Sequence, residues 1–179
     1  MDGVLCDFVK RTVMLCGRNL TQVINHWNLG TYNTAPNLGI TDEVMWQAIM
    51  GDHAFWLALE QPPWVPDLLD VFDGCDLRIC SKPSQHDPRS ATDKIVWLKQ
   101  HQLGHIPYHL TNLKEDLAGP RRVLIDDCDE HCVKFREEGG HAIVFPQPWN
   151  SSFPYVFSRI ERVAAEFQAI LNEMESGDE

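Results

Sequence analysis

The sequence contains no long run of hydrophobic residues. No apolar stretch approaches the roughly 20 residues that a membrane-spanning helix needs. Near the N-terminus, Asp2 and Asp7 stand where a secretory signal would have a basic region followed by an apolar core. We therefore expect neither a membrane span nor a signal peptide, and we expect the protein to be cytoplasmic.

Basic residues are also scarce. Lys and Arg number 15 against 26 Asp and Glu, so the formal net charge is −11. A non-specific nucleic-acid binder needs a basic face that replaces phosphate counterions, and an anionic membrane attracts basic segments. The charge thus argues against nucleic-acid and membrane partners. A small anionic substrate stays compatible, because a local metal ion or lysine can outweigh the overall field.

Several sequence signatures of ligand and metal binding are absent. There is no GxxxxGK(S/T) or GxGxxG loop, which disfavours ATP-dependent kinases and dinucleotide-binding oxidoreductases. Cys128 and Cys132 lie four residues apart around His131, but no second pair with zinc spacing follows. The six cysteines are scattered, and we expect reduced thiols rather than disulfides or zinc ligands.

In the second half of the chain, short apolar runs typical of strands alternate with amphipathic patterns typical of helices. At 179 residues the chain suffices for one domain with a small insertion. Such alternation predicts an α/β fold, with right-handed crossovers and a parallel sheet covered by helices on both faces. Strands are expected at residues 76–82, 108–111, 121–127 and 141–147, and helices at 90–104, 129–140 and 158–174.

The residues before this alternation are rich in helical patterns. Residues 41–59 read as one helix, capped by Thr41 and with acidic residues at the positive end of its dipole. Residues 62–74 read as a short helix entered through prolines. We interpret residues 9–70 as a helical cap inserted after the first strand, and residues 1–8 with 71–179 as the core domain.

Polar residues follow the expected strands. Ligands of such sheets bind at the carboxyl ends of the strands, which would bring Ser81, Thr111 and the Asp126–Asp127 pair to one crevice. Lys114, which follows the strand that ends at Thr111, can place an ammonium in the same crevice. Adjacent carboxylates repel each other unless a cation is present, and Mg²⁺ prefers oxygen ligands. A metal ion, a hydroxyl and an ammonium around one point form a receptor for a phosphoryl group.

Each of these residues has a plainer reading when taken alone. An acid pair after a strand can be a helix cap or a solvated loop, Ser81 a turn residue, and Lys114 a surface lysine. Their order and spacing are what favour a phosphate site.

Four segments together carry a resemblance to a known family. "MDGVLCDF", "ICSKP", "HLTNLK" and "VLIDD" resemble, in order, the four motifs of the haloacid dehalogenase (HAD) superfamily of phosphatases. The segment "GGHAIVFPQPWN", and "DFV" after the first motif, resemble its 5'(3')-deoxyribonucleotidase branch. The resemblance runs from Met1 to about Asn150 and implies a HAD-like Rossmannoid parallel sheet with a small helical cap.

The resemblance implies a Mg²⁺-dependent 5'-nucleotidase that removes phosphate from (deoxy)ribonucleoside monophosphates. In the first motif, Asp-x-Asp-Gly, the first Asp attacks phosphorus to give an aspartyl-phosphate, and the second is general acid and then base. Asp2 matches this second Asp, and the backbone carbonyl of Asp2 matches a metal ligand of the family. Ser81 matches the hydroxyl that binds phosphoryl oxygens, and Lys114 the lysine that neutralises charge. Asp126 and Asp127 match the acidic pair that holds Mg²⁺.

The residues expected to contact the substrate match the relatives at some positions and depart from them at others. Phe8, Phe55 and Trp56 match positions where relatives place aromatic rings against the nucleobase, and such stacking is worth about 1–3 kcal/mol per base. The alternative is that Phe55 and Trp56 form the buried face of a cap helix. Lys82 and Asn112 depart from residues common in relatives, and we place both among the candidate phosphate and sugar contacts.

The first motif begins with its second residue in this sequence. Met1 matches the x, so no residue printed here matches the nucleophilic Asp, and we expect weak or absent activity of the chain as printed. A truncated or wrongly assigned start explains this more simply than lost catalysis, because most of a central strand is missing with it. The alternative is a non-catalytic nucleotide-binding or regulatory protein. The sequence leaves the oligomeric state open, with a homodimer as the assembly compatible with it.

Overall fold

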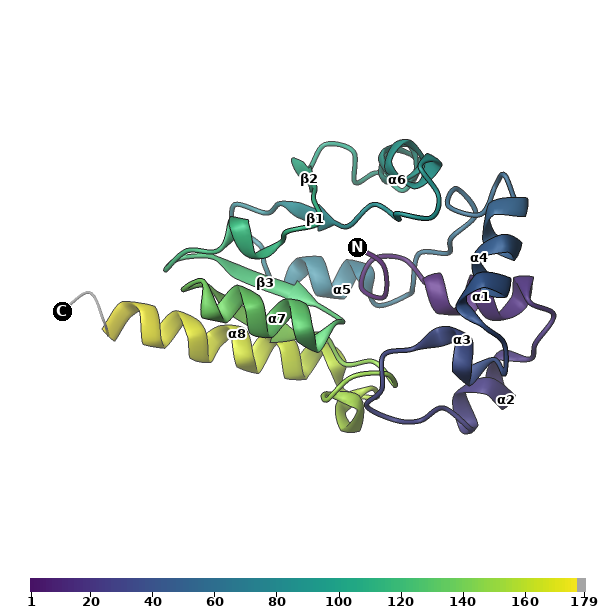
Figure 1. Ribbon diagram of the computed structural model, residues 1–179. Coiled ribbons are helices and arrows are strands. Elements are labelled where there is room, and N and C mark those ends of the chain that lie inside the picture. Colours follow the sequence, from purple (N-terminus) through teal and green to yellow (C-terminus); the bar gives the residue numbers. More distant parts are fainter. Residues whose placement is uncertain (177–179) are drawn as a thin grey trace. The chain divides into compact units, whose positions relative to one another are not determined.

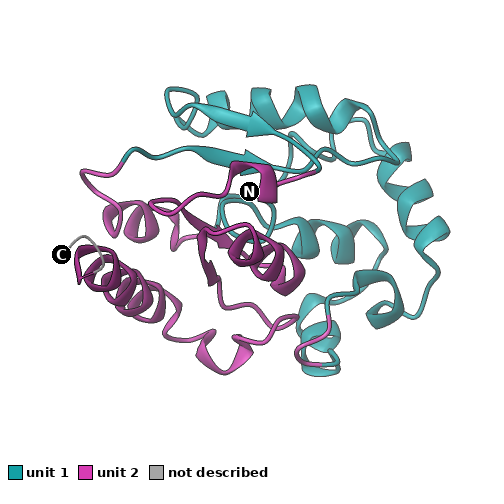
Figure 2. Ribbon diagram, turned by 60° about the vertical axis from the view of Figure 1, so that its left-hand side comes forward, with its two compact units in different colours: residues 1–28, 32–62, 76–112 teal, residues 29–31, 63–75, 113–179 magenta. Residues whose placement is uncertain are grey.

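The structure is a computed structural model that describes residues 1–176 (Figure 1). The chain divides into two units (Figure 2). Unit 1 comprises residues 1–28, 32–62 and 76–112, and unit 2 comprises residues 29–31, 63–75 and 113 onward. These units are not the predicted division into a core (1–8 and 71–179) and a cap (9–70), which stays a prediction.

Unit 1 combines a helical region with one β-α-β segment. A helix, α6, connects its two parallel strands, as parallel strands require. Its elements are α1 (Phe8–Leu15), α2 (Leu20–Asn25), α3 (Thr34–Asn37), α4 (Asp42–Gly51), β1 (Ile79–Ser81), α6 (Arg89–Gln100) and β2 (Tyr108–Leu110).

Unit 2 is built around a second β-α-β segment. Helices α7 and α8 both contact the β3–β4 pair (Figure 1). The centre of the unit is a buried cluster of Leu124, Cys132, Phe135, Ala142 and Val144. The elements are α5 (Val65–Asp70), η1 (Glu115–Leu117), β3 (Val123–Asp126), α7 (Asp129–Glu137), β4 (His141–Val144), η2 (Phe153–Tyr155) and α8 (Arg159–Ser176).

The predicted single sheet is replaced by two small ones. Both strand pairs are parallel, which confirms the expected direction, but the described part of the chain forms two separate two-stranded sheets. The N-terminal segment contributes an isolated bridge between Asp2 and Cys6 rather than a strand. This segment does not form a strand because its backbone groups bond to each other in a tight loop. The Gly3 amide donates to the Cys6 carbonyl (2.8 Å), and the Leu5 amide donates to the Met1 carbonyl (2.7 Å).

The helix predicted for residues 41–59 is wrong beyond Gly51. Its start is confirmed, because the Thr41 hydroxyl accepts from the Val44 amide (3.3 Å). Its end is set by Asp52, whose backbone is extended and whose carboxylate accepts from the Ala54 amide (3.0 Å). A short polar side chain that binds the backbone two residues on favours a turn over a continued helix.

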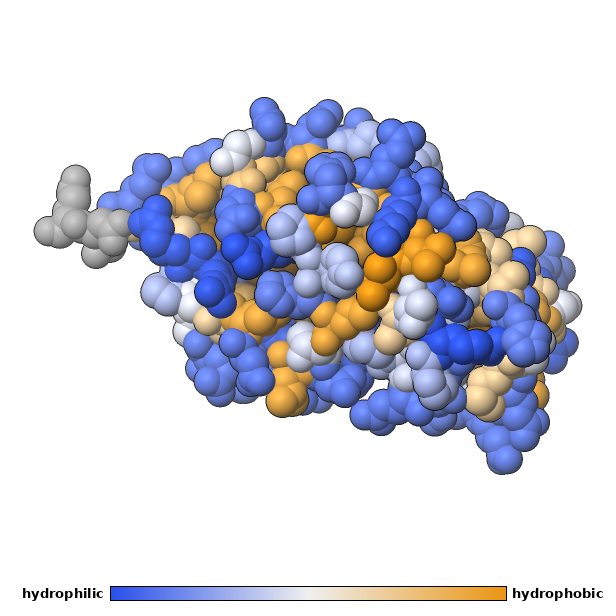
Figure 3. Space-filling model, turned by 90° about the horizontal axis from the view of Figure 1, so that it is seen from above, coloured by the Kyte–Doolittle hydropathy of each residue, from blue (hydrophilic) through white to orange (hydrophobic). Residues whose placement is uncertain are grey.

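The six cysteines are free thiols, as expected. No disulfide joins any of the six cysteines, all of which lie within the described residues. The thiol of Cys132 is packed, with its sulfur 3.7 Å from the carbonyl oxygens of Asp126 and Ile143. Along residues 1–176 the structure has no helix both long and apolar enough to cross a membrane. On the face drawn in Figure 3, hydrophobic residues reach the surface between more numerous hydrophilic ones.

Candidate active site

Asp2 lies in the tight N-terminal loop of unit 1. Gly3 adopts a left-handed backbone (φ 72°), which allows the turn that follows Asp2. The Met1 amino group donates to the carbonyl of Cys80 in β1 (3.2 Å), so the loop is tied to the strand. The first motif is therefore held beside β1, the strand that carries Ser81.

Both carboxylate oxygens of Asp2 have a partner. The Lys94 ammonium donates to Oδ2 (2.6 Å), and the Cys6 thiol donates to Oδ1 (3.4 Å). Burial favours the neutral acid, but the Lys94 charge and hydrogen bond outweigh it and hold the pKa of Asp2 below its ordinary value. Burial and the nearby Asp2 carboxylate raise the pKa of Cys6, so its thiol stays protonated and can donate.

Ser81 is the last residue of β1 and is buried. Its hydroxyl oxygen lies 3.1 Å from the ammonium nitrogen of Lys94, and its carbonyl accepts from the Thr111 amide (3.0 Å). The structure thus brings two candidate residues, Asp2 and Ser81, to one lysine. The side chains of Lys82 and Asn112 are both exposed, and the Lys82 carbonyl also accepts from Lys94 (2.8 Å).

Lys94 itself was missed by the motif reasoning. It lies 92 residues from Asp2 along the chain, so no local spacing connects the two. One signal was available: Lys94 lies on the face of the predicted helix that also carries Ser90, Trp97 and Leu98, and all four are buried. A lysine on the apolar face of an amphipathic helix calls for a buried partner.

The predicted aromatic residues form one cluster in unit 1. The ring centroid of Phe8 lies 5.5 Å from that of Phe55 and 5.7 Å from that of Trp56. Phe55 and Trp56 are buried, and the Trp56 indole donates to the carboxylate of Asp87 (2.9 Å). Phe8 is half-buried. Phe55 and Trp56 are buried, as the plainer reading expects, but they lie in a turn beyond the end of α4 rather than on a helix. Their contact with a base stays a prediction.

Lys114 and Asp126 meet in unit 2. Asp126 ends β3, and its buried carboxylate pairs with the buried Lys114 ammonium. Its other oxygen accepts from the Cys128 amide (3.0 Å) and from His131 Nδ1 (3.1 Å). Burial alone would raise the pKa of Asp126, but His131 and Lys114 hold it far below its ordinary value. The bond to Asp126 raises the pKa of His131 to about 9.

Asp127 lies in a very different electrostatic environment. Burial and the neighbouring Asp126 charge raise its pKa to about 7, although its carboxylate accepts from the Trp149 indole (2.8 Å). The Asn150 amide donates to the backbone carbonyls of Asp127 (2.9 Å) and Phe145 (2.8 Å). Trp149 and Asn150, which the motif reasoning did not single out, thus hold this residue in place.

The donor set of unit 2 fits a hard divalent cation. Within residues 1–176, no group of three or more His, Cys, Asp or Glu side chains is arranged to hold a metal ion. Mg²⁺ does not need such a group, because it keeps several waters and takes one or two carboxylates with substrate phosphate. Asp126 and Asp127 supply two carboxylates. Burial and, after it, the charge of Asp126 raise the pKa of Asp127, and a cation would relieve the repulsion between the two carboxylates.

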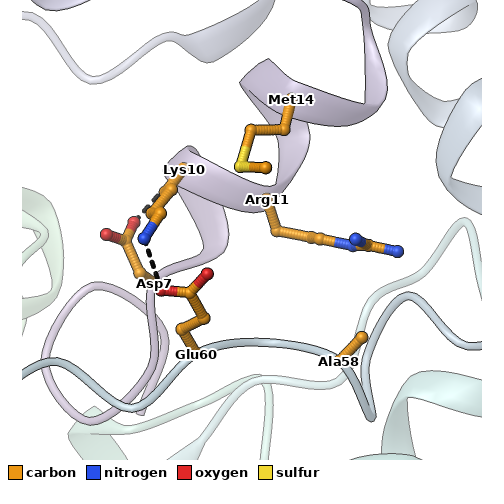
Figure 4. Close-up of a pocket in the computed structure, with 6 residues that line it drawn as sticks. All are labelled: Asp7, Lys10, Arg11, Met14, Ala58 and Glu60. Carbon is orange, nitrogen blue, oxygen red and sulfur yellow. Dashed lines mark hydrogen bonds and ion pairs between the residues drawn. The ribbon is translucent and has the colours of Figure 1, made fainter. Parts of the chain in front are cut away.

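A separate surface pocket lies in unit 1 beside helix α1 (Figure 4). Lys10 and Glu60 form an ion pair across it. Its lining residues, which are distinct from the candidate site residues, are Asp7, Lys10, Arg11, Met14, Ala58 and Glu60.

Comparison with known proteins identifies the family. Residues 1–172 match the family described as "5' nucleotidase, deoxy (Pyrimidine), cytosolic type C protein". A comparison with curated proteins gives no match. The family match includes every candidate residue described above and agrees with the parallel β-α-β segments of both units. The chain therefore belongs to this 5'-nucleotidase family of the HAD superfamily.

Proposed function

We propose that this protein is a Mg²⁺-dependent phosphomonoester hydrolase that removes phosphate from (deoxy)ribonucleoside monophosphates. The observation that carries the proposal is the family match over residues 1–172. Nucleotidases of the HAD superfamily are typically Mg²⁺-dependent, and the carboxylate pair at the end of β3 supports that requirement here. In line with the family description, the proposed location is the cytosol.

Each candidate residue takes a role that its contacts support. Asp2 acts as general acid and then base, and its carboxylate is already anchored within unit 1. Ser81 donates its hydroxyl to a phosphoryl oxygen. Lys114 neutralises developing charge, and Asp126 and Asp127 hold Mg²⁺. Bound Mg²⁺ would supply further charge neutralisation at the phosphate. The family motifs are the basis for assigning the residues of unit 1 (Asp2 and Ser81) and those of unit 2 (Lys114, Asp126 and Asp127) to one reaction.

The proposed hydrolysis also needs the nucleophilic Asp of the family motif. Asp2 matches the second acid of that motif, and the position of the first is not among the printed residues. A version that carries this Asp at the end of a preceding apolar strand should release phosphate.

The test is phosphate release from dUMP, dTMP and other nucleoside monophosphates, with Mg²⁺ and with EDTA. It is run on the printed chain and on the version extended by a strand and Asp. Activity of the extended version that disappears in Asp126→Asn and Asp127→Asn supports the proposal. Absence of activity in every version, together with retained binding of nucleotide, would favour the non-catalytic nucleotide-binding protein instead.

Base recognition is proposed for the aromatic cluster, with Phe8 as its half-buried member. Substitution Phe8→Ala should raise KM for the nucleotide more than it lowers kcat, because stacking binds ground state and transition state alike. Lys82→Ala and Asn112→Ala test the proposed phosphate and sugar contacts in the same assay.

The proposed oligomeric state is a homodimer, and light scattering of the protein in solution tests it.

A further inference from the structure

Lys94 carries a positive charge in the interior of unit 1. Its side chain is 1 % exposed. Lysine is almost never fully buried unless its charge is paired, because removal from water disfavours an isolated ammonium. The contacts of Lys94 must therefore account for the position of this charge.

The ammonium of Lys94 has three polar partners. It donates to Asp2 Oδ2 (2.6 Å), to Ser81 Oγ (3.1 Å) and to the Lys82 carbonyl (2.8 Å). A lysine has three N–H donors and no acceptor, so all three donors are engaged within unit 1. The Trp56 ring also covers the ammonium, with 5.0 Å between Nζ and the ring centroid. Lys94 is thus arranged to hold protein groups rather than to bind a substrate.

These contacts orient the two candidate residues. Because Ser81 Oγ accepts from Lys94, the proton of its hydroxyl is directed to a different acceptor. The Asp2 carboxylate is fixed at both ends, by Lys94 at Oδ2 and by Cys6 at Oδ1. Acid–base catalysis depends on such fixed geometry, since a proton moves only between groups within hydrogen-bond reach.

We propose that Lys94 is a positioning residue, which fixes the Asp2 carboxylate and the Ser81 hydroxyl for hydrolysis of the phosphate ester. This inference rests on the proposed function. It adds a residue that acts through Asp2 and Ser81, distinct from the charge-neutralising Lys114.

The first test is structural and does not depend on activity. Crystal structures of the printed chain and of its Lys94→Met variant are compared, because Met keeps the length of the side chain and removes the donors. The Asp2 and Ser81 side chains are expected to leave their rotamers in the variant. Unchanged rotamers for both would overturn the proposal. Lys94→Leu, which also lacks donors, serves in the same way where Lys94→Met does not fold.

The second test uses whichever version releases phosphate. Lys94→Met should lower kcat by about 10- to 100-fold, with a KM change within about threefold. Lys99→Met, on the same helix but exposed, is the matched control and should leave both parameters unchanged. Equal kinetics of Lys94→Met and the control would contradict a positioning role.

Chemical rescue separates positioning from a merely structural role. Added propylammonium should restore part of the activity of Lys94→Ala, because it brings N–H donors to the vacated space. Tetramethylammonium, which has the charge but no donor, should not. Equal rescue by both ions, or by neither, would count against the proposal. Where no version releases phosphate, the proposed function fails, and the structural comparison still decides the role of Lys94.

Discussion

Asp87, like Lys94, is a charged residue of unit 1 whose burial is matched by its contacts. Its carboxylate accepts from the Trp56 indole (2.9 Å), from the Arg89 amide (3.1 Å) and from the Arg89 guanidinium. Burial alone would raise the pKa of Asp87, but the bonds from Arg89 and Trp56 hold it below its ordinary value of 3.8. A carboxyl with a depressed pKa stabilises the fold only while it is ionised.

Asp87→Asn should lower the free energy of unfolding at pH 7 by about 1.5–3 kcal/mol, the usual worth of hydrogen bonds to a charged group. The contribution is complete above the ordinary pKa and is lost as pH falls through the depressed one. The difference from the unmodified chain should therefore shrink below about pH 4 in urea unfolding. Asp76→Asn, in an exposed ion pair with Arg78, is the control and should change little.

At the scale of single residues, sequence motifs reveal some residues of the site and not others. The sequence predicts Asp2, Ser81, Lys114 and the acid pair as site residues because their motifs follow one another along the chain. Lys94 and Trp149 are not predicted, because each meets its partner only after folding, across 92 residues to Asp2 and 22 residues to Asp127. Residues that hold other residues in place leave a weak local signal, namely a polar group on an apolar face.

At the scale of elements, the expected strands and most expected helices lie within one or two residues of their predicted ranges. The large difference is in the helix expected up to residue 59, which ends at Gly51. Hydrophobic spacing continues past that point, but the Asp52 carboxylate binds the local backbone and ends the helix. A periodic pattern therefore predicts where a helix is favoured, while single polar side chains decide where it stops.

The turn between α7 and β4 leaves no room for a side chain at Gly140. A Cβ atom at Gly140 would lie 2.3 Å from Cε1 of Phe135, which belongs to the buried cluster of unit 2. Gly140→Ala should therefore destabilise the protein by about 1–3 kcal/mol, because the packed ring cannot move without a cost. In the control Gly51→Ala, nothing lies within 4 Å of the added atom. Urea midpoints that shift equally in the two variants would refute this account.

At the scale of the whole molecule, the excess of acidic residues favours the binding of a cation. A net charge of −11 opposes compaction through self-repulsion, and Asp126 and Asp127 add a local, buried repulsion. A ligand that binds only the folded state stabilises it by mass action. Mg²⁺ bound at the acid pair should therefore stabilise the folded protein even where no substrate is present.

At free Mg²⁺ about 100 times its Kd, binding should raise the free energy of unfolding by about 2.7 kcal/mol. For a chain of this length, that raises Tm by about 5–10 °C. Thermal melts of Asp127→Asn should lose the Mg²⁺-dependent rise, while its Tm in EDTA stays equal or higher, because one of two repelling charges has gone. The matched control is Glu137→Gln with Glu138→Gln, an exposed acid pair of the same unit, which should keep the rise. A rise that survives in Asp127→Asn and in Asp126→Asn would place the cation elsewhere, and the metal assignment would fall with it.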